Sequence, residues 1–213
     1  MTREKPESAP STSRQRVLDV ALAAVDAGTF ETLSLDAVRT QAGVSNGSLY
    51  YHFPSWPHLV DGTYATIIGA YQDGILEAIA PTRTAARALA ALIRCHVLWC
   101  ERQPERAKFL RRGRARVSRD AADAIHLGNA RFVSAVVSQL RRGGASAELP
   151  DDLLVAFLVG PLDAYARGRV EGRAGTSPPQ AIRILTEKLG ALILGAPPPV
   201  TTKSPRRATG ARR

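Results

Sequence analysis

Apolar residues recur every three or four positions along most of this 213-residue chain, the spacing of one face of an α-helix. No segment alternates apolar and polar residues with a period of two, so no β-strand is predicted. Breaks at Gly, Pro and Ser divide the pattern into about nine helices, and we expect an all-α fold without internal repeats. The expected helices span residues 13–27, 34–42, 46–52, 56–80, 83–101, 104–113, 120–142, 151–169 and 179–194.

The most informative stretch is SLDAVRTQAGVSNGSLYYHF, residues 34–53. Ser34 and Ser45 each stand where a hydroxyl can accept a hydrogen bond from the free N–H groups of a helix start. Gly43 lies between the two helices and suits a left-handed turn. Leu49 and Phe53 share a face of the second helix, which leaves short polar and aromatic side chains on its other faces. The stretch therefore predicts a helix-turn-helix whose second helix reads the major groove of DNA.

The last two helices carry more apolar surface than one subunit can cover. Residues 151–169 are apolar on almost all sides through their first half, and residues 179–194 add a further apolar face. We expect these two helices to form the seam of a homodimer, packed as a four-helix bundle.

Composition changes near both ends of the chain. Residues 1–12 are rich in Ser, Pro and charge, and residues 196–213 are rich in Pro and basic residues, so we expect a disordered arm and a disordered basic tail. Between them we expect a helix-turn-helix domain at residues 13–56 and a second helical domain at residues 57–195.

The formal charge is +10, from 29 basic and 19 acidic residues, which favours a polyanion as partner. The excess does not lie in the helix-turn-helix, because residues 14–58 hold three Arg and four acidic residues. It lies in residues 101–119, with eight basic and two acidic residues, and in residues 196–213, with five basic and no acidic residues. We expect the first block to be a solvated helix face; its alternative roles are non-specific attraction of DNA and an anionic effector site.

Several other classes of protein are disfavoured. Cys95 and Cys100 lie five residues apart in one expected helix, poorly placed to form a disulfide, and the adjacent His96 side chain points in another direction from Cys95. The four His and two Cys show no metal-ligand spacing, so no metal and no cofactor are expected. The longest uncharged apolar run, residues 153–162, is too short to span a bilayer, and no signal peptide is evident. We expect a cytoplasmic protein that is not an enzyme.

With these residues in view, the chain resembles a TetR-type transcriptional regulator. The resemblance rests on RQRVLDVALAAVDAG in the first helix, on Ser34, and chiefly on AGVSNGSLYYHF from Ala42 to Phe53. It implies a homodimer that binds a near-palindromic operator as a repressor and is released by a small molecule held in the C-terminal helices, here residues 57–195. The chain has Trp56 and Pro57 where the family commonly has a Lys, which removes one expected phosphate contact.

The resemblance also implies which residues contact DNA. Ser34 and Ser45 would bind phosphates, and Asn46 and Ser48 would read bases, although both residue types also favour ordinary helix starts. Tyr50, Tyr51 and His52 would contact the backbone or, alternatively, form a half-buried aromatic cluster. The full set is Ser34, Arg39, Gln41, Ser45, Asn46, Gly47, Ser48, Tyr50, Tyr51 and His52.

An effector pocket is implied among the C-terminal helices. Its expected lining comprises Tyr64, Tyr71, His96, Trp99, Phe109, Phe132 and Tyr165, each of which taken alone is equally suited to the core. As a group these residues favour an apolar or aromatic effector with one hydrogen-bonding group. Two other readings stay open: an enzyme or small-molecule carrier built on the C-terminal helices, and a transcriptional activator.

Overall fold

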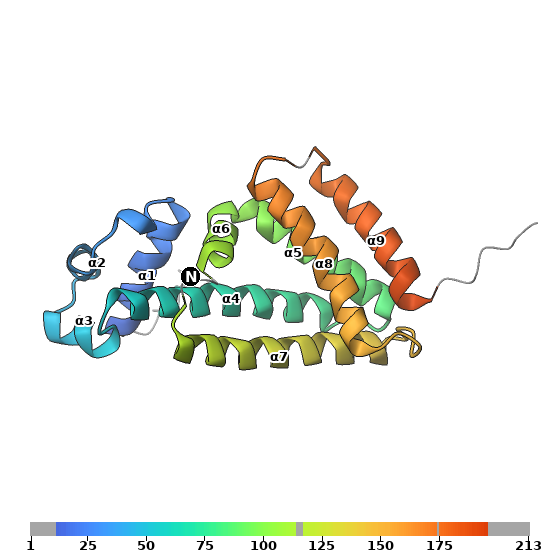
Figure 1. The fold of residues 1–213 in the computed structure, drawn as a ribbon, viewed down its shortest axis with the longest axis horizontal. Helices are drawn as coiled ribbons and strands as arrows, with labels where there is room; N and C mark the ends of the chain where they lie inside the picture. The colour runs from blue at the N-terminus through green and yellow to red at the C-terminus, as the bar shows by residue number, and fades with distance from the viewer. Residues whose placement is uncertain (1–11, 114–116, 174, 196–213) are drawn as a thin grey trace, which may run out of the picture.

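The computed structural model describes residues 12–113, 117–173 and 175–195, and within these residues it contains nine α-helices, a short 3-10 helix and no strand. The prediction of an all-α fold is confirmed (Figure 1). The predicted tail, and the predicted arm apart from Thr12, lie outside the described residues. The helices are α1 (Ser13–Asp26), η1 (Phe30–Thr32), α2 (Leu35–Ala42), α3 (Asn46–His52), α4 (Trp56–Ile79), α5 (Ala85–Arg102), α6 (Pro104–Gly113), α7 (Arg119–Arg142), α8 (Asp151–Val170) and α9 (Pro178–Leu194).

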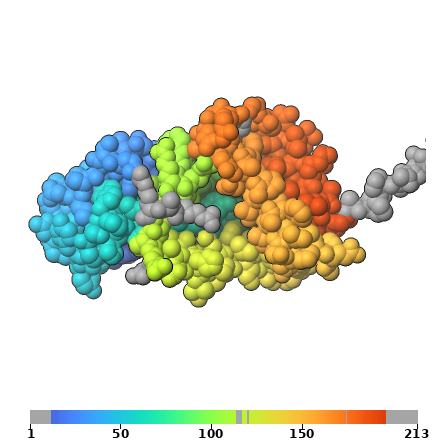
Figure 2. Space-filling model, viewed as in Figure 1, coloured from blue at the N-terminus to red at the C-terminus, as the bar shows by residue number. Residues whose placement is uncertain are grey.

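The first three α-helices and η1 form one end of the molecule, which we call the head (Figure 2). Each α-helix begins at a hydroxyl that accepts a backbone N–H: Thr12 from Gln15, Ser34 from Ala37 and Ser45 from Ser48. Gly43 turns the chain between α2 and α3 in the left-handed conformation, with φ 61°. Its cap N–H bonds to the carbonyl groups of Arg39 and Thr40. The caps and the turn expected from the sequence are therefore present.

The core of the head continues into α4. Leu59, Val60 and Ile67 of this helix are buried in the same cluster as the apolar faces of α1, α2 and α3. The sequence boundary near residue 56 thus falls at the start of a helix whose first half packs with the head. Ser55 precedes α4 but does not cap it as expected, because its Oγ lies 2.8 Å from His58 Nδ1 and makes no bond to a backbone N–H.

We call α5 to α9 the body; α4 runs from the head into it. The central helix α5 packs against α4 and α9, while α7 lies along α4 and α8 covers the remaining side (Figure 1). The body core gathers side chains from α4, α5, α7, α8 and α9. The backbone at the end of α7 nearly touches the start of α5. A Cβ on Gly143 would lie 2.3 Å from Ala85 N, and the Gly143 carbonyl accepts a hydrogen bond from that N–H at 2.7 Å.

The basic helix α6 links head and body. Arg106 binds both carboxylate oxygens of Asp26 at the end of α1, at 2.7 and 2.8 Å, and Phe109 packs edge-on against Phe30 of the head. Farther along, Arg111 binds Glu171 at the end of α8. The solvated helix face expected from the sequence is therefore wrong for Arg106 and Arg111, since each binds a residue of a neighbouring helix.

Candidate functional site

The short helix α3 presents most of its side chains to solvent. Leu49 and Phe53 anchor it, with both side chains almost completely buried in the core of the head. Because these anchors occupy one face, Tyr50 and Tyr51 point outward with 52% and 80% of their surface exposed. The alternative of a half-buried aromatic cluster is therefore wrong for these two residues. Their exposure leaves the rings and hydroxyls free to contact a partner.

The polar residues of α3 lie at its first turn. Asn46 and Gly47 are exposed and Ser48 is half-buried, so the amide of Asn46 can reach a partner that approaches the start of the helix. Gly47 has open space around it, which lets a partner come close to the backbone. Short amide and hydroxyl side chains at the start of an exposed helix are suited to the base edges of a major groove.

Two helix starts contribute hydroxyls to the same unit. Ser34 Oγ accepts from Ala37 N and Ser45 Oγ accepts from Ser48 N, each at 3.2 Å. Both serines are exposed, and each hydroxyl keeps its own hydrogen to donate to a phosphate. The positive ends of the α2 and α3 dipoles favour an anion at these positions. Capping and phosphate binding are thus compatible at both serines.

The three remaining predicted DNA contacts are Arg39, Gln41 and His52. Arg39 is held along its own helix by Asp36, at 2.9 Å, and by the Thr40 hydroxyl, at 3.2 Å. Gln41 is exposed, and the half-buried His52 ring packs edge-on against Tyr51. An Arg39 contact with phosphate would have to share or replace the Asp36 carboxylate.

Sequence reasoning missed two basic residues at the start of α1. Arg16 Nη1 donates to the Gly43 carbonyl at 3.2 Å, so it supports the turn between α2 and α3. The Arg14 guanidinium lies 5.8 Å from the centre of the Phe53 ring, directly after α3. Both are exposed and bring positive charge beside α3. The sequence does place two Arg at the beginning of the first helix, but it does not show that this end packs against the turn.

An apolar cavity of about 220 Å³ lies in the body, walled by α4, α5, α6, α7 and α8. Four of the seven predicted pocket residues line it: Tyr71, His96, Trp99 and Phe132. Valine and leucine side chains from α7 and α8 form half of the remaining wall. The cavity therefore suits a mainly apolar guest.

The structure places the other three predicted pocket residues elsewhere. Phe109 turns to the head, with its ring centre 4.9 Å from that of Phe30. Tyr64 is buried beside Gly113 and borders an adjoining groove between α4, α7 and α8. Tyr165 donates its hydroxyl to the Thr176 carbonyl, 3.4 Å away. Helical spacing predicted that these aromatic side chains are at least partly buried, but not which neighbour each one meets.

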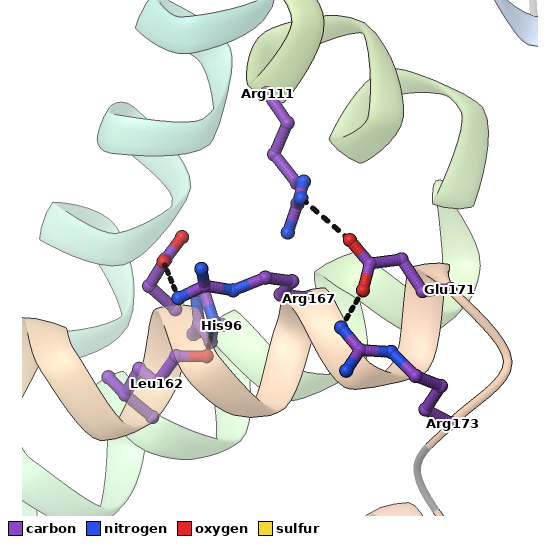
Figure 3. Close-up of polar contacts among 7 residues, drawn as sticks. His96, Arg111, Leu162, Arg167, Glu171 and Arg173 are labelled. Atoms are coloured by element: carbon purple, nitrogen blue, oxygen red, sulfur yellow. Dashed lines mark hydrogen bonds and ion pairs between the residues drawn. The ribbon is translucent and has the colours of Figure 1, made fainter.

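One polar pair faces the cavity. The Tyr71 hydroxyl lies 2.8 Å from His96 Nδ1. His96 Nε2 lies 3.3 Å from the carbonyl of Leu162, and Figure 3 draws these two residues. Because a carbonyl only accepts, Nε2 carries the hydrogen and Nδ1 accepts from Tyr71. Burial lowers the pKa of His96, partly offset by the Leu162 carbonyl, and burial raises the pKa of Tyr71. Both side chains are therefore neutral at pH 7.

The thiols do not form a reactive site with His96. Cys100 Sγ is 3.9 Å from His96 Nε2, and burial raises the pKa of this thiol to about 12. Burial also raises the pKa of Cys95. Protonated thiols beside a neutral imidazole are poor nucleophiles. Among the described residues no group of three or more His, Cys, Asp or Glu side chains could hold a metal ion, and no helix there is long and apolar enough to cross a membrane.

Comparison with known proteins finds a family similarity over the head and the start of α4. Residues 17–61 match the family model described as bacterial regulatory proteins, tetR family. No curated protein sequence matches the chain significantly.

Solved structures extend the similarity to the body, at identities that show the fold alone. A putative TetR-family transcriptional regulator from Rhodococcus sp. is 18% identical, with a TM-score of 0.67 over 86% of this chain and 100% of that chain. The fatty acid degradation regulator FadR from Bacillus halodurans is 14% identical, with a TM-score of 0.67 over 88% and 96%. FadR from Bacillus subtilis, solved in complex with stearoyl-CoA, is 17% identical, with a TM-score of 0.65 over 85% and 98%.

Proposed function

We propose that this chain is a TetR family DNA-binding transcription regulator and that it acts in the cytoplasm as a homodimeric repressor. A small molecule releases the repressor from a palindromic operator. The observation that carries the DNA-binding part is the exposed start of α3. Asn46 and Ser48 read base edges there, while the hydroxyls of Ser34 and Ser45 bind phosphates on either side. Tyr50, Tyr51 and His52 contact the backbone beyond them.

The homodimer forms through α8 and α9. Leu153 and Phe157 on α8 and Leu192 on α9 leave 43%, 37% and 45% of their surface exposed, although each is large and apolar. Burying these side chains against the same surface of a second copy removes them from water and gives a two-fold symmetric four-helix bundle. The symmetry then places two α3 helices in successive major grooves, about one helical turn apart.

The effector binds in the cavity and acts through α4. Tyr71, in the second half of this helix, lines the cavity, while Leu59, in its first half, is buried in the core of the head. A tilt of α4 caused by an occupied cavity changes the separation of the two heads. The effector shifts the equilibrium only as far as it prefers the released state over the DNA-bound state. FadR from Bacillus subtilis, which has the same fold, was solved with stearoyl-CoA, which supports a bound effector.

A mobility-shift experiment tests the DNA-binding part. The purified protein is titrated onto the intergenic DNA upstream of its own gene at two salt concentrations, with a shuffled duplex of the same composition as control. We expect saturable binding to the upstream DNA that survives the higher salt, while binding to the shuffled duplex is lost. Equal binding to both duplexes would contradict a sequence-specific regulator, and increased transcription from a reconstituted promoter would indicate an activator.

A further inference from the structure

We infer that the effector is an amphipathic anion, whose apolar part fills the body cavity and whose anionic group binds Lys108, Arg111 and Arg112 at the cavity mouth. The inference rests on the proposed function in one respect: that the cavity holds the effector. It adds the chemical class of that effector and the residues that recognise its charge.

A basic surface pocket adjoins the cavity. It is lined by Lys108, Arg111 and Arg112 of α6 and by Val170 and Glu171 at the end of α8. Arg111 and Val170 also line the cavity, so the two spaces meet at these side chains, and we call this junction the cavity mouth. Three cations and one carboxylate surround the pocket, whereas the cavity lining is almost entirely apolar. One molecule that spans both spaces would have an apolar body and a negatively charged end.

The Tyr71–His96 pair inside the cavity offers no hydrogen-bond donor for that charge. His96 is neutral, and both of its ring nitrogens are engaged, one by Tyr71 and the other by the Leu162 carbonyl. Tyr71 in turn uses its hydrogen on His96, so the pair has no donor left for an anion. A charge buried without a partner is strongly disfavoured. An anionic group must therefore stay at the mouth.

A positively charged effector is disfavoured as well. The carboxylate that lines the cavity belongs to Asp163, and Arg167 binds it at 3.2 Å. Its negative charge is already compensated by that guanidinium. Positive charge is in excess beside the cavity, because Glu105 pairs with Lys108 and Glu171 with Arg111, and Arg112 adds a third cation to these two pairs.

The structure already contains a carboxylate at the proposed anion position. Glu171 caps the C-terminal end of α8, and its carboxylate lies between Arg111, at 3.0 Å, and Arg173 (Figure 3). Its side chain is partly exposed and follows the last helical residue, so it can turn away into water. An effector carboxylate or phosphate would replace it on Arg111, where charge-assisted hydrogen bonds favour an anion. Glu171 thus competes with the effector for Arg111.

Four decyl compounds test this directly, because their chains are equal and their head groups differ: decanoate, decyl phosphate, decanol and decyltrimethylammonium. Binding to the full chain is measured by isothermal titration calorimetry below the micelle concentration of each compound. Trp99 lines the cavity and offers a second readout by fluorescence in a Trp56→Phe background, which leaves Trp99 as the remaining tryptophan. The matched variants are Arg111→Gln, Glu171→Gln and, as a charge control, Arg87→Gln on the exposed start of α5.

We expect the two anions to bind about tenfold or more tightly than decanol, and decyltrimethylammonium to bind weakest. Arg111→Gln should weaken the anions by about tenfold and leave decanol unchanged, while Glu171→Gln should strengthen the anions. Arg87→Gln should change none of them. The order of decanoate and decyl phosphate tells which anionic group the mouth prefers.

Three results would overturn the inference: equal binding of decanol and the anions, tightest binding of the cation, or an Arg111→Gln variant that binds anions normally. The first two, in which a compound still binds, would leave the cavity as an effector site. If none of the compounds binds, both the inference and the effector part of the proposed function fail. Sequence-specific DNA binding is measured separately and does not depend on any of these outcomes.

Discussion

The side-chain hydrogen bonds within the body reach farther along the chain than those within the head. In the head, each α-helix begins with a side-chain hydrogen bond that spans three residues, as Ser34 to Ala37 and Ser45 to Ser48 show. In the body, α5 and α7 begin with the same kind of bond, and further bonds join distant segments: Arg169 binds Glu101 across 68 positions, and Ser118 at the start of α7 binds Asp61 of α4 across 57. The head contains the exposed α3, while the body encloses a cavity.

The head and the body are suited to different tasks. A surface that reads DNA must keep its side chains within a fraction of an ångström, and local caps with a filled core provide that rigidity. A region that responds to a guest must have two arrangements of similar free energy, which a cavity bordered by five helices allows. Helix α4 belongs to both regions and connects them.

The largest expected effect tests whether a second copy of the chain covers the exposed apolar face of α8. Phe157→Asp places a charge on the exposed apolar face of α8, and we expect it to convert the dimer to a monomer. Because two linked heads bind two half-sites together, DNA affinity should fall by about a hundredfold or more. Sedimentation velocity and mobility shift measure the two effects.

Leu127→Asp is the matched control, since Leu127 is a similarly exposed apolar residue on α7. It should leave the dimer intact. A monomeric wild-type protein, or a Phe157→Asp variant that remains dimeric, would contradict the proposed seam.

The next effect concerns the head alone. Asn46→Ala removes the amide proposed to read a base, and we expect a loss of about 1–3 kcal/mol of discrimination between the operator and variants at one base pair. Tyr50→Phe should instead weaken binding to all sequences by a similar factor, because a phosphate contact carries no sequence information. Competition binding on a set of single-base operator variants distinguishes them. Normal binding by both variants would refute the placement of α3 in the groove.

A third, smaller effect belongs to the body. Burial lowers the pKa of His96 below its ordinary value of 6.5, so below pH 6.5 the unfolded chain binds more protons than the folded chain. Stability should therefore decrease as the pH falls from 6.5 toward the lowered pKa, by at most about 1.4 kcal/mol per pH unit. Urea unfolding at pH 7.5, 6.5 and 5.5 measures this. His96→Gln should reduce the slope even if it lowers stability at every pH; an unchanged slope would remove His96 as the cause.

The smallest effect tests the link between the two regions. Arg106→Gln breaks the ion pair with Asp26, and because both side chains are partly exposed we expect a loss of only about 0.2–1 kcal/mol. A double-mutant cycle with Asp26→Asn, followed by urea unfolding, isolates the pair. Lys108→Gln is the control, since Lys108 pairs with Glu105 on its own helix. A coupling free energy of zero would mean that the head and α6 are held together by Phe109 and its neighbours alone.

Local contacts could be predicted from the sequence, whereas contacts between distant segments could not. Ser34, Gly43 and Ser45 act on residues three or four positions away, so their roles follow from the chain itself. Tyr71 and His96 were placed near a pocket through the resemblance, but their mutual hydrogen bond depends on how α4 meets α5. Periodicity says that a side chain is buried and leaves its partner undetermined.

Phe109 illustrates the limit. Its helix was expected to be a solvated basic face or an effector site, yet the ring lies in the head against Phe30. The pair Arg106 and Asp26, 80 positions apart, was equally hidden, because nothing in either segment indicates the other. The DNA contacts of α3 and the effector role of the cavity remain predictions that the experiments above address.

The close contact between α3 and α4 has a consequence for exchanging specificity between regulators. A Cβ on Gly62 would lie 2.9 Å from the Phe53 ring, so the residue that ends the DNA-reading unit rests on a position of α4 that admits no side chain. A chimera joined at residue 56 would combine this Phe with a foreign α4 and leave the core of the head open. A transplantable unit must extend at least through Ile67, and it must bring a compatible partner for Phe30 in place of Phe109.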